Sequence, residues 1–179
     1  MRLFIAIEIP EEIRNYLFRI KDNFNRNLAK VNWTAKSRIH ITLKFLGEVD
    51  EKLIPKLIEK LKEIKFESFE LGLDSLGVFP NESHARVLWV GVENFNKVIE
   101  LQQDIEEKLM DYFEKDKEFS AHITLGRIKV VKDKSKFKMA FRKIKIARHK
   151  FKVDSFSLIK SELSRAGPTY TIVDKFVSN

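Results

Sequence analysis

The tetrapeptide His-Ile-Thr-Leu occurs twice in this chain of 179 residues, at residues 40–43 and at residues 122–125, each time within a strand-like stretch. The chain has only four histidines, and two of them open these copies. Successive side chains of a β-strand point to opposite faces. Each copy would therefore present a histidine and a threonine on one face and bury an isoleucine and a leucine on the other. The repeat predicts two similar strands whose polar faces line one shared site.

The elements expected around the repeat do not alternate regularly. Strands are predicted at residues 2–9, 38–47, 66–80, 85–92 and 120–131, within 145–163, and after a turn at Gly167-Pro168. Helices are predicted at residues 10–30, 49–64 and 94–113, with a short helix or loop at 134–144. This order is typical of an α+β protein with antiparallel sheets rather than of a doubly wound parallel sheet. No linker interrupts the chain, so we expect a single domain over residues 1–179.

Composition and charge exclude some functions. Cysteine is absent, which removes a thiolate nucleophile and any cysteine-based metal site. No apolar stretch has the length of a membrane span or of a secretory leader, so we expect a cytoplasmic protein. The net charge is +8, and residues 127–152 hold twelve lysines and arginines against the single acid Asp133. This basic segment is interpreted either as a solvated lysine-rich face or as a surface that attracts a polyanion.

Two imidazoles and two hydroxyls suit chemistry at a phosphate. A histidine pKa near 6.5 makes both protonation states accessible at neutral pH, so one ring can take a proton while the other gives one. Threonine hydroxyls and the nearby Arg127 would bind phosphate oxygens. Strict alternation places Arg127 on the wrong face, unless a bulge at Gly126 turns it inward. The best match is displacement at a phosphodiester without a metal, and zinc bound by two histidines and a carboxylate is the competing hypothesis.

Other catalytic signatures are missing from the sequence. It contains no G-x-x-x-x-G-K-[ST] phosphate loop, no G-x-S-x-G serine elbow and no H-E-x-x-H zinc motif. We therefore predict no metal and no cofactor.

Two H-hydrophobic-T-hydrophobic tetrapeptides at this separation resemble the signature of the 2H phosphoesterase superfamily. More closely, the chain resembles the bacterial and archaeal RNA 2′,3′-cyclic phosphodiesterases, also called 2′-5′ RNA ligases. The resemblance covers nearly the whole chain and rests on "RLFIAIEIP", "HITLKFLGEV", "VFP" with "RVLWVGV", "HITLGR" and "SELSRAGPTY". It implies a bilobal α+β fold in which two pseudo-twofold-related lobes of antiparallel sheet, with helices packed outside, flank a central cleft.

The resemblance also implies a reaction and a role for each site residue. A 2′,3′-cyclic phosphate at an RNA end would be opened to a 2′-phosphate, with reversible 2′-5′ ligation in some members. His122 would accept a proton from water, and His40 would donate one to the leaving 3′-oxygen. Thr42, Thr124 and Arg127 would bind the phosphate.

The resemblance also implies a partner for the protein. The expected partner is RNA with a 2′,3′-cyclic phosphate or 2′-phosphate end, including tRNA halves, and the expected state is a monomer that does not bind membranes. Phe45 and Phe79 are candidate surfaces for base stacking. One alternative is a non-catalytic RNA-end or tRNA-binding protein that uses the same basic cleft. Others are a physiological 2′-5′ ligase and a phosphodiesterase for small cyclic nucleotides.

Overall fold

The computed structural model describes residues 1–164 and 167–179, which form nine strands and four α-helices. The strands are β1 (Arg2–Glu8), β2 (Ala29–Trp33), β3 (His40–Glu48), β4 (Phe69–Phe79), β5 (Val87–Glu93), β6 (His122–Val131), β7 (Lys150–Val153), β8 (Ser155–Ser164) and β9 (Gly167–Val177). The helices are α1 (Glu11–Arg19), α2 (Ile54–Lys62), α3 (Phe95–Leu109) and α4 (Lys134–Lys143). Neighbouring strands pair antiparallel, which confirms the α+β class.

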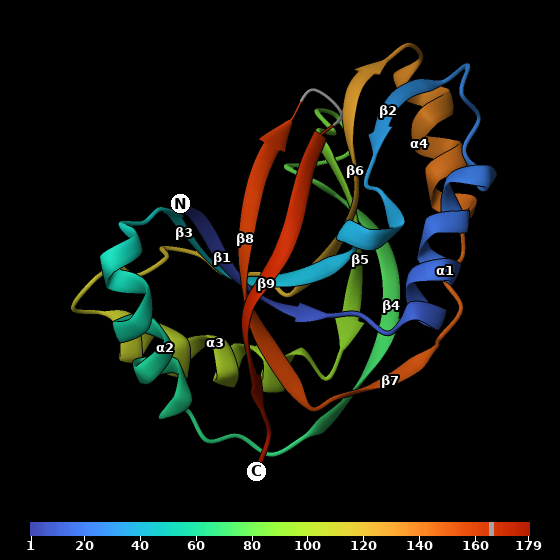
Figure 1. The fold of residues 1–179 in the computed structure, drawn as a ribbon. Coiled ribbons are helices and arrows are strands. Elements are labelled where there is room, and N and C mark those ends of the chain that lie inside the picture. The colour runs from blue at the N-terminus through green and yellow to red at the C-terminus, as the bar shows by residue number, and fades with distance from the viewer. Residues whose placement is uncertain (165–166) are drawn as a thin grey trace.

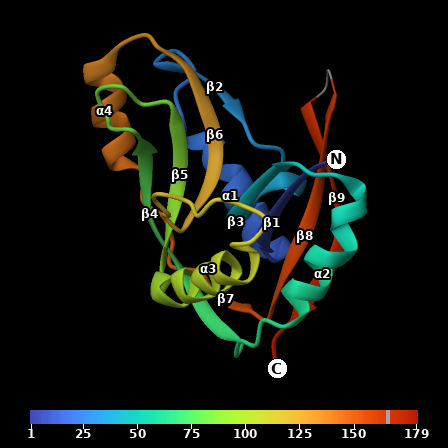
Figure 2. The same cartoon turned by 90° about the vertical axis from the view of Figure 1, so that its left-hand side faces the viewer.

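The sheet is built symmetrically around the two strands that carry the repeat. Its order is β7-β4-β5-β6-β3-β1-β8-β9, with β2 beside β6. Outward from the centre, β3 is followed by β1, β8 and β9, and β6 is followed by β5, β4 and β7. Each lobe therefore contains strands from both halves of the chain. Strand β8, from the C-terminal half, lies in the lobe built around β3, and β4, from the N-terminal half, lies in the lobe built around β6. Figure 2 shows these two curled groups of strands on opposite sides of the molecule, as the bilobal prediction requires.

The helices lie outside the sheet and bury apolar faces against it. Helices α1 and α4 lie on one side of the molecule, and α2 and α3 lie on the other (Figure 1). The longest, α3, buries Val98, Leu101, Ile105 and Leu109, which follow helical spacing. Within the described residues, no helix is both long and apolar enough to span a membrane.

The first helix is shorter than the sequence predicted. Helix α1 ends at Arg19, a 3-10 turn follows over Ile20–Asn23, and β2 begins at Ala29. The predicted helix at residues 10–30 therefore includes a turn and the start of a strand that was missed. The physical reason is the asparagine-rich stretch between them. The side-chain oxygen of Asn25 accepts a hydrogen bond from the backbone N–H of Asn27, which favours a turn over continued helix.

The last hairpin differs in detail from its prediction. Gly167 and Pro168 were expected to form the turn, but they are the first residues of β9, paired with Ser164 and Leu163 of β8. Residues 165–166, between these strands, lie outside the described residues. The hairpin places Tyr170 opposite Ser161.

Candidate functional site

The two copies of the repeat cross at the centre of the sheet. Strands β3 and β6 are antiparallel, with Ile41 directly opposite Ile123. This register places His40 across from Thr124 and Thr42 across from His122. The isoleucines and leucines of both copies are at most 3% exposed, so the aliphatic faces are buried as alternation predicts. Each histidine therefore lies beside the threonine of the other copy, an arrangement with approximate twofold symmetry.

The two imidazoles are oriented in the same way. Nδ1 of His40 lies 2.7 Å from the carbonyl oxygen of Arg38, and Nδ1 of His122 lies 2.7 Å from that of Ser120. A carbonyl only accepts hydrogen bonds, so Nδ1 of each ring carries a hydrogen. In the neutral ring the lone pair is then on Nε2. For His40 this atom lies 2.9 Å from the Thr42 hydroxyl, which donates to the neutral ring and accepts from the protonated one.

Burial favours the neutral form of both rings. Desolvation lowers the pKa of His40 below 6.5, the Arg38 carbonyl opposes this, and the charge of His122 lowers the pKa further. Desolvation also lowers the pKa of His122, and the Ser120 carbonyl opposes it. The charge of His122 therefore adds to the effect of burial on His40.

A bulge turns Arg127 toward the same side as the repeat. Along β5, Leu88 and Trp89 are consecutive, but their partners on β6 are Gly126 and Thr124. Leu125 is therefore an extra residue, and beyond it Arg127 faces the cavity described below. This is the irregularity that the sequence predicted next to Gly126.

Glycine at position 126 is required by a close neighbour. A Cβ atom built there would lie 2.8 Å from Cγ1 of Val31 and 3.0 Å from the carbonyl oxygen of Asn32. Strand β2 therefore passes too close for any side chain, and the missing side chain allows β2 to pair with β6.

Strand β3 has the same bulge, which makes two further positions equivalent. Ile5 and Ala6 of β1 pair with Lys44 and Thr42, so one residue of β3 is again extra. The first eight residues of β3 and β6 have the same burial pattern. Phe45, which is 67% exposed, therefore occupies on β3 the position that Arg127 occupies on β6. One end of the site presents an aromatic ring where the other presents a cation.

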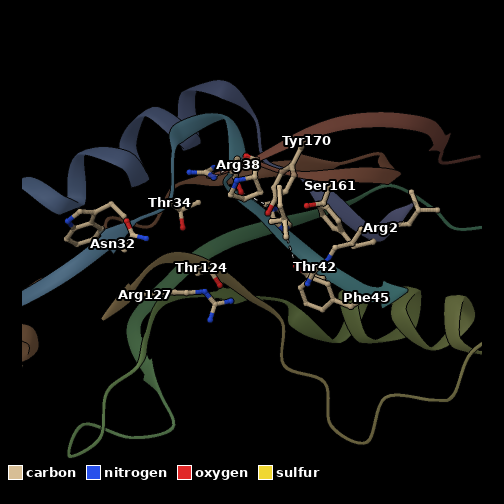
Figure 3. Close-up of a pocket in the computed structure, with 16 residues that line it drawn as sticks. Arg2, Asn32, Thr34, Arg38, Thr42, Phe45, Thr124, Arg127, Ser161 and Tyr170 are labelled. Carbon is tan, nitrogen blue, oxygen red and sulfur yellow. Dashed lines mark hydrogen bonds between the residues drawn. The ribbon is translucent and has the colours of Figure 1, made fainter. Parts of the chain in front are cut away.

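A cavity of about 330 Å³ opens over the crossing strands. It is lined by His40, Thr42, Thr124 and Arg127, four of the five residues predicted from the sequence, and Figure 3 shows three of them labelled on their strands. His122 is not among the lining residues. It lies beside the cavity, since it is across from Thr42 and its charge acts on His40.

Sequence reasoning missed eight polar or aromatic residues among those that line the cavity, namely Arg2, Phe4, Asn32, Trp33, Thr34, Arg38, Ser161 and Tyr170. Three of them had a signal, because Arg2 opens the stretch "RLFIAIEIP" and Ser161 and Tyr170 open and close the stretch "SELSRAGPTY". The Tyr170 ring lies 5.6 Å from that of His40, edge to face. The others come from segments distant in sequence, and no spacing along the chain connects them.

The two aromatic candidates differ in position. Phe45 lines the cavity and is exposed. Phe79 instead stacks on Trp89 with ring centroids 4.9 Å apart and contacts the His122 ring edge to face at 5.0 Å. Phe45 therefore has an exposed face for stacking, whereas Phe79 packs against His122 and Trp89.

The basic segment is partly compensated by acids from other elements. Lys138 and Arg142 pair with Glu82, while Arg148 pairs with Glu93. Part of its charge is therefore held in surface ion pairs, and its contribution to the cavity is Arg127. Among the described residues, no three His, Asp or Glu side chains are grouped as a metal site would require.

Similarity to known proteins extends over the whole chain. The model of the family described as LigT like Phosphoesterase matches twice, at residues 7–89 and 90–170, so each match contains one copy of the repeat. An RNA 2′,3′-cyclic phosphodiesterase of Methanocaldococcus jannaschii is 37% identical over 183 residues, covering 98% of this chain and 100% of the relative. The crystal structure of a Thermus thermophilus protein has a TM-score of 0.83 at 28% identity, covering 99% of this chain and 97% of the other. The Escherichia coli LigT complexed with 3′-AMP has a TM-score of 0.78 at 26% identity, covering 99% and 97%.

Proposed function

Because this chain belongs to the LigT-like phosphoesterase family, we propose that it hydrolyses the 2′,3′-cyclic phosphate at RNA ends to a 2′-phosphate, with His40 and His122 as acid and base. The observation that supports this most is the crossed pair of His/Thr copies, oriented alike beside a cavity that also holds Arg127. The names of the relatives support the substrate class. RNA with cyclic-phosphate or 2′-phosphate ends, including tRNA halves, is the proposed partner.

The proposed reaction is a single in-line displacement. Water attacks phosphorus while Nε2 of His122 takes its proton. The bond from phosphorus to the 3′-oxygen breaks, and His40 protonates that oxygen, leaving a 3′-hydroxyl and a 2′-phosphate. Thr42, Thr124 and Arg127 bind the non-bridging oxygens, where negative charge increases in the transition state. If the 5′-hydroxyl of a second RNA replaces water, the same steps join the strands by a 2′-5′ linkage.

The surroundings of the two rings support this assignment of roles. His40 is the more enclosed, between Phe4 and Tyr170 at ring-centroid distances of 5.1 and 5.6 Å. The hydrogen bond between His122 and Ser120 is exposed, whereas that between His40 and Arg38 is partly buried, so His122 is the nearer of the two to the attacking water.

Product analysis tests the proposal. The protein is incubated with a short RNA that ends in a 2′,3′-cyclic phosphate, and the terminal group is identified by phosphorus NMR or mass spectrometry with isomer standards. A 2′-phosphate is expected. A 3′-phosphate would reverse the leaving-group assignment, and joined strands would support ligation. RNA binding without turnover of any cyclic phosphate would favour the non-catalytic RNA-end-binding alternative.

The pH dependence of kcat/KM should be bell-shaped with a maximum below pH 6.5. Activity requires one protonated and one neutral ring, and both pKa values are lowered from 6.5 in the free protein. The singly protonated pair is therefore lost as the pH rises past the higher of the two values. The profile of kcat alone should lie at higher pH, because a bound anionic phosphate stabilises the imidazolium. Steady-state rates from pH 4.5 to 9 measure both, and a kcat/KM that stays constant from pH 6.5 to 8.5 would contradict the prediction.

A further inference from the structure

The cavity extends beyond the residues that the proposed reaction uses. Thr124 and Arg127 lie at one end of it, and Arg2, Phe45 and Ser161 lie at the other (Figure 3). A single cyclic phosphate held by the threonines and Arg127 leaves the end around Arg2 without a function.

This second end is cationic and lacks a counter-ion in the described part of the chain. Within residues 1–164 and 167–179, no aspartate or glutamate lines the cavity. Among the described residues, the ion pairs of arginine side chains join Arg142 to Glu82 and Arg148 to Glu93, and Arg2 takes part in none. An unpaired guanidinium group in a concave site favours an anionic ligand.

Tyr170 lies among the guanidinium groups of Arg2, Arg38 and Arg127. Burial raises the pKa of its hydroxyl, and the charges of Arg38, Arg127 and Arg2 each oppose that rise. All three guanidinium groups therefore act on the same phenol. Its ring packs against Phe4 at 4.9 Å and against His40 at 5.6 Å, so the hydroxyl is held over the middle of the cavity.

Arg38 is fixed in place by the start of β9. Its Nη1 donates to the carbonyl oxygen of Pro168 at 3.1 Å. A Cβ atom at Gly167 would lie 2.7 Å from the same nitrogen, and Gly167 has a φ of +108°, which favours glycine. The backbone of the last hairpin therefore orients this guanidinium before any ligand binds, which lowers the entropic cost of binding.

We propose that Arg2, with the Tyr170 hydroxyl, forms a second phosphate subsite that binds the phosphodiester on the 5′ side of the terminal nucleotide. Arg38 lies on the other side of Tyr170, toward Thr34 (Figure 3). The proposal rests on the proposed function, since it places the cyclic phosphate at Thr42, Thr124 and Arg127. RNA has one phosphate per nucleotide, so an oligonucleotide end supplies this second anion and a nucleoside 2′,3′-cyclic phosphate does not. The exposed ring of Phe45 lies at the same end as Arg2, where the terminal base can stack on it. The subsite makes the enzyme selective for RNA ends over cyclic mononucleotides.

The test compares two substrates on the same protein. One is cytidine 2′,3′-cyclic phosphate, and the other is the dinucleotide CpC with a terminal 2′,3′-cyclic phosphate. The wild-type protein should have the higher kcat/KM for the dinucleotide. Arg2→Gln should lower the dinucleotide value roughly tenfold, as expected for loss of one charged contact to phosphate, and should lower the mononucleotide value much less. For Arg2→Lys, the kcat/KM on the dinucleotide should lie between the values of the wild-type protein and of Arg2→Gln, because lysine keeps the charge but not the planar fork.

A matched control separates this effect from general electrostatics. Arg26→Gln removes the same charge from an exposed turn between α1 and β2 and should leave the substrate ratio unchanged. Equal losses on both substrates in Arg2→Gln, or equal wild-type activity on both, would overturn the second subsite while leaving the hydrolysis intact. Absence of hydrolysis of either substrate by the wild-type protein would instead refute the proposed function.

Discussion

Replacing His40 or His122 by alanine is expected to lower kcat/KM for a cyclic-phosphate RNA end by roughly 10²–10⁴-fold in each single variant. The two rings perform different proton transfers in one displacement, so neither can substitute for the other. Each Nδ1 already donates to a carbonyl, which leaves one Nε2 per ring for the reaction. Initial rates at matched protein concentration, with product identified as above, measure the loss.

The control for this prediction is His84→Ala. His84 is exposed in the connection between β4 and β5 and does not line the cavity, so its removal should leave the rate unchanged. Thermal unfolding of all three variants shows whether they remain folded. Full activity in either His40→Ala or His122→Ala would refute the two-histidine assignment.

The largest expected effect on stability comes from Lys44. It follows the first copy of the repeat but points away from the cavity, where it is only 2% exposed. Its Nζ lies 2.7 Å from a carboxylate oxygen of Glu106 on α3, 3.5 Å from Asp116, and donates to the carbonyl of Glu114 at 2.9 Å. Lys44→Met keeps most of the side-chain volume but leaves Glu106 charged and buried. We expect the free energy of unfolding to fall by about 3–5 kcal/mol, measured by urea denaturation.

Two further variants give this prediction its controls. The double variant Lys44→Met/Glu106→Gln removes both charges and should recover much of the lost stability, because no unpaired buried charge remains. Lys97→Met breaks an exposed pair with Glu100, whose nitrogen–oxygen distance is also 2.7 Å, and should change stability by less than about 1 kcal/mol. Similar small losses in Lys44→Met and Lys97→Met would show that burial does not strengthen the Lys44 pair.

The site was predictable from the sequence where local rules decide it. Alternation assigned the faces of both repeat strands, because a strand has a period of two whatever its neighbours are. A glycine after the second copy indicated the bulge that turns Arg127 inward. The helix at residues 10–30 was predicted too long, because the apolar spacing continues past Arg19. The asparagine turn that ends the helix is a local feature, which the spacing does not reveal. These features depend on residues close together in the chain.

Other features needed the tertiary structure. The sequence alone determined that two strands each present a histidine and a threonine, since backbone geometry dictates how side chains alternate. Only the folded sheet decided that they cross at Ile41 and Ile123, which places each histidine beside the other copy's threonine. It also decided that β8 and β9 return to the lobe built around β3, bringing Tyr170 and Ser161 to the same cavity as Arg2 and Arg38. The pairing of strands that are distant in sequence depends on which surfaces fit together once the chain has collapsed. The local periodicity of a sequence does not predict that pairing.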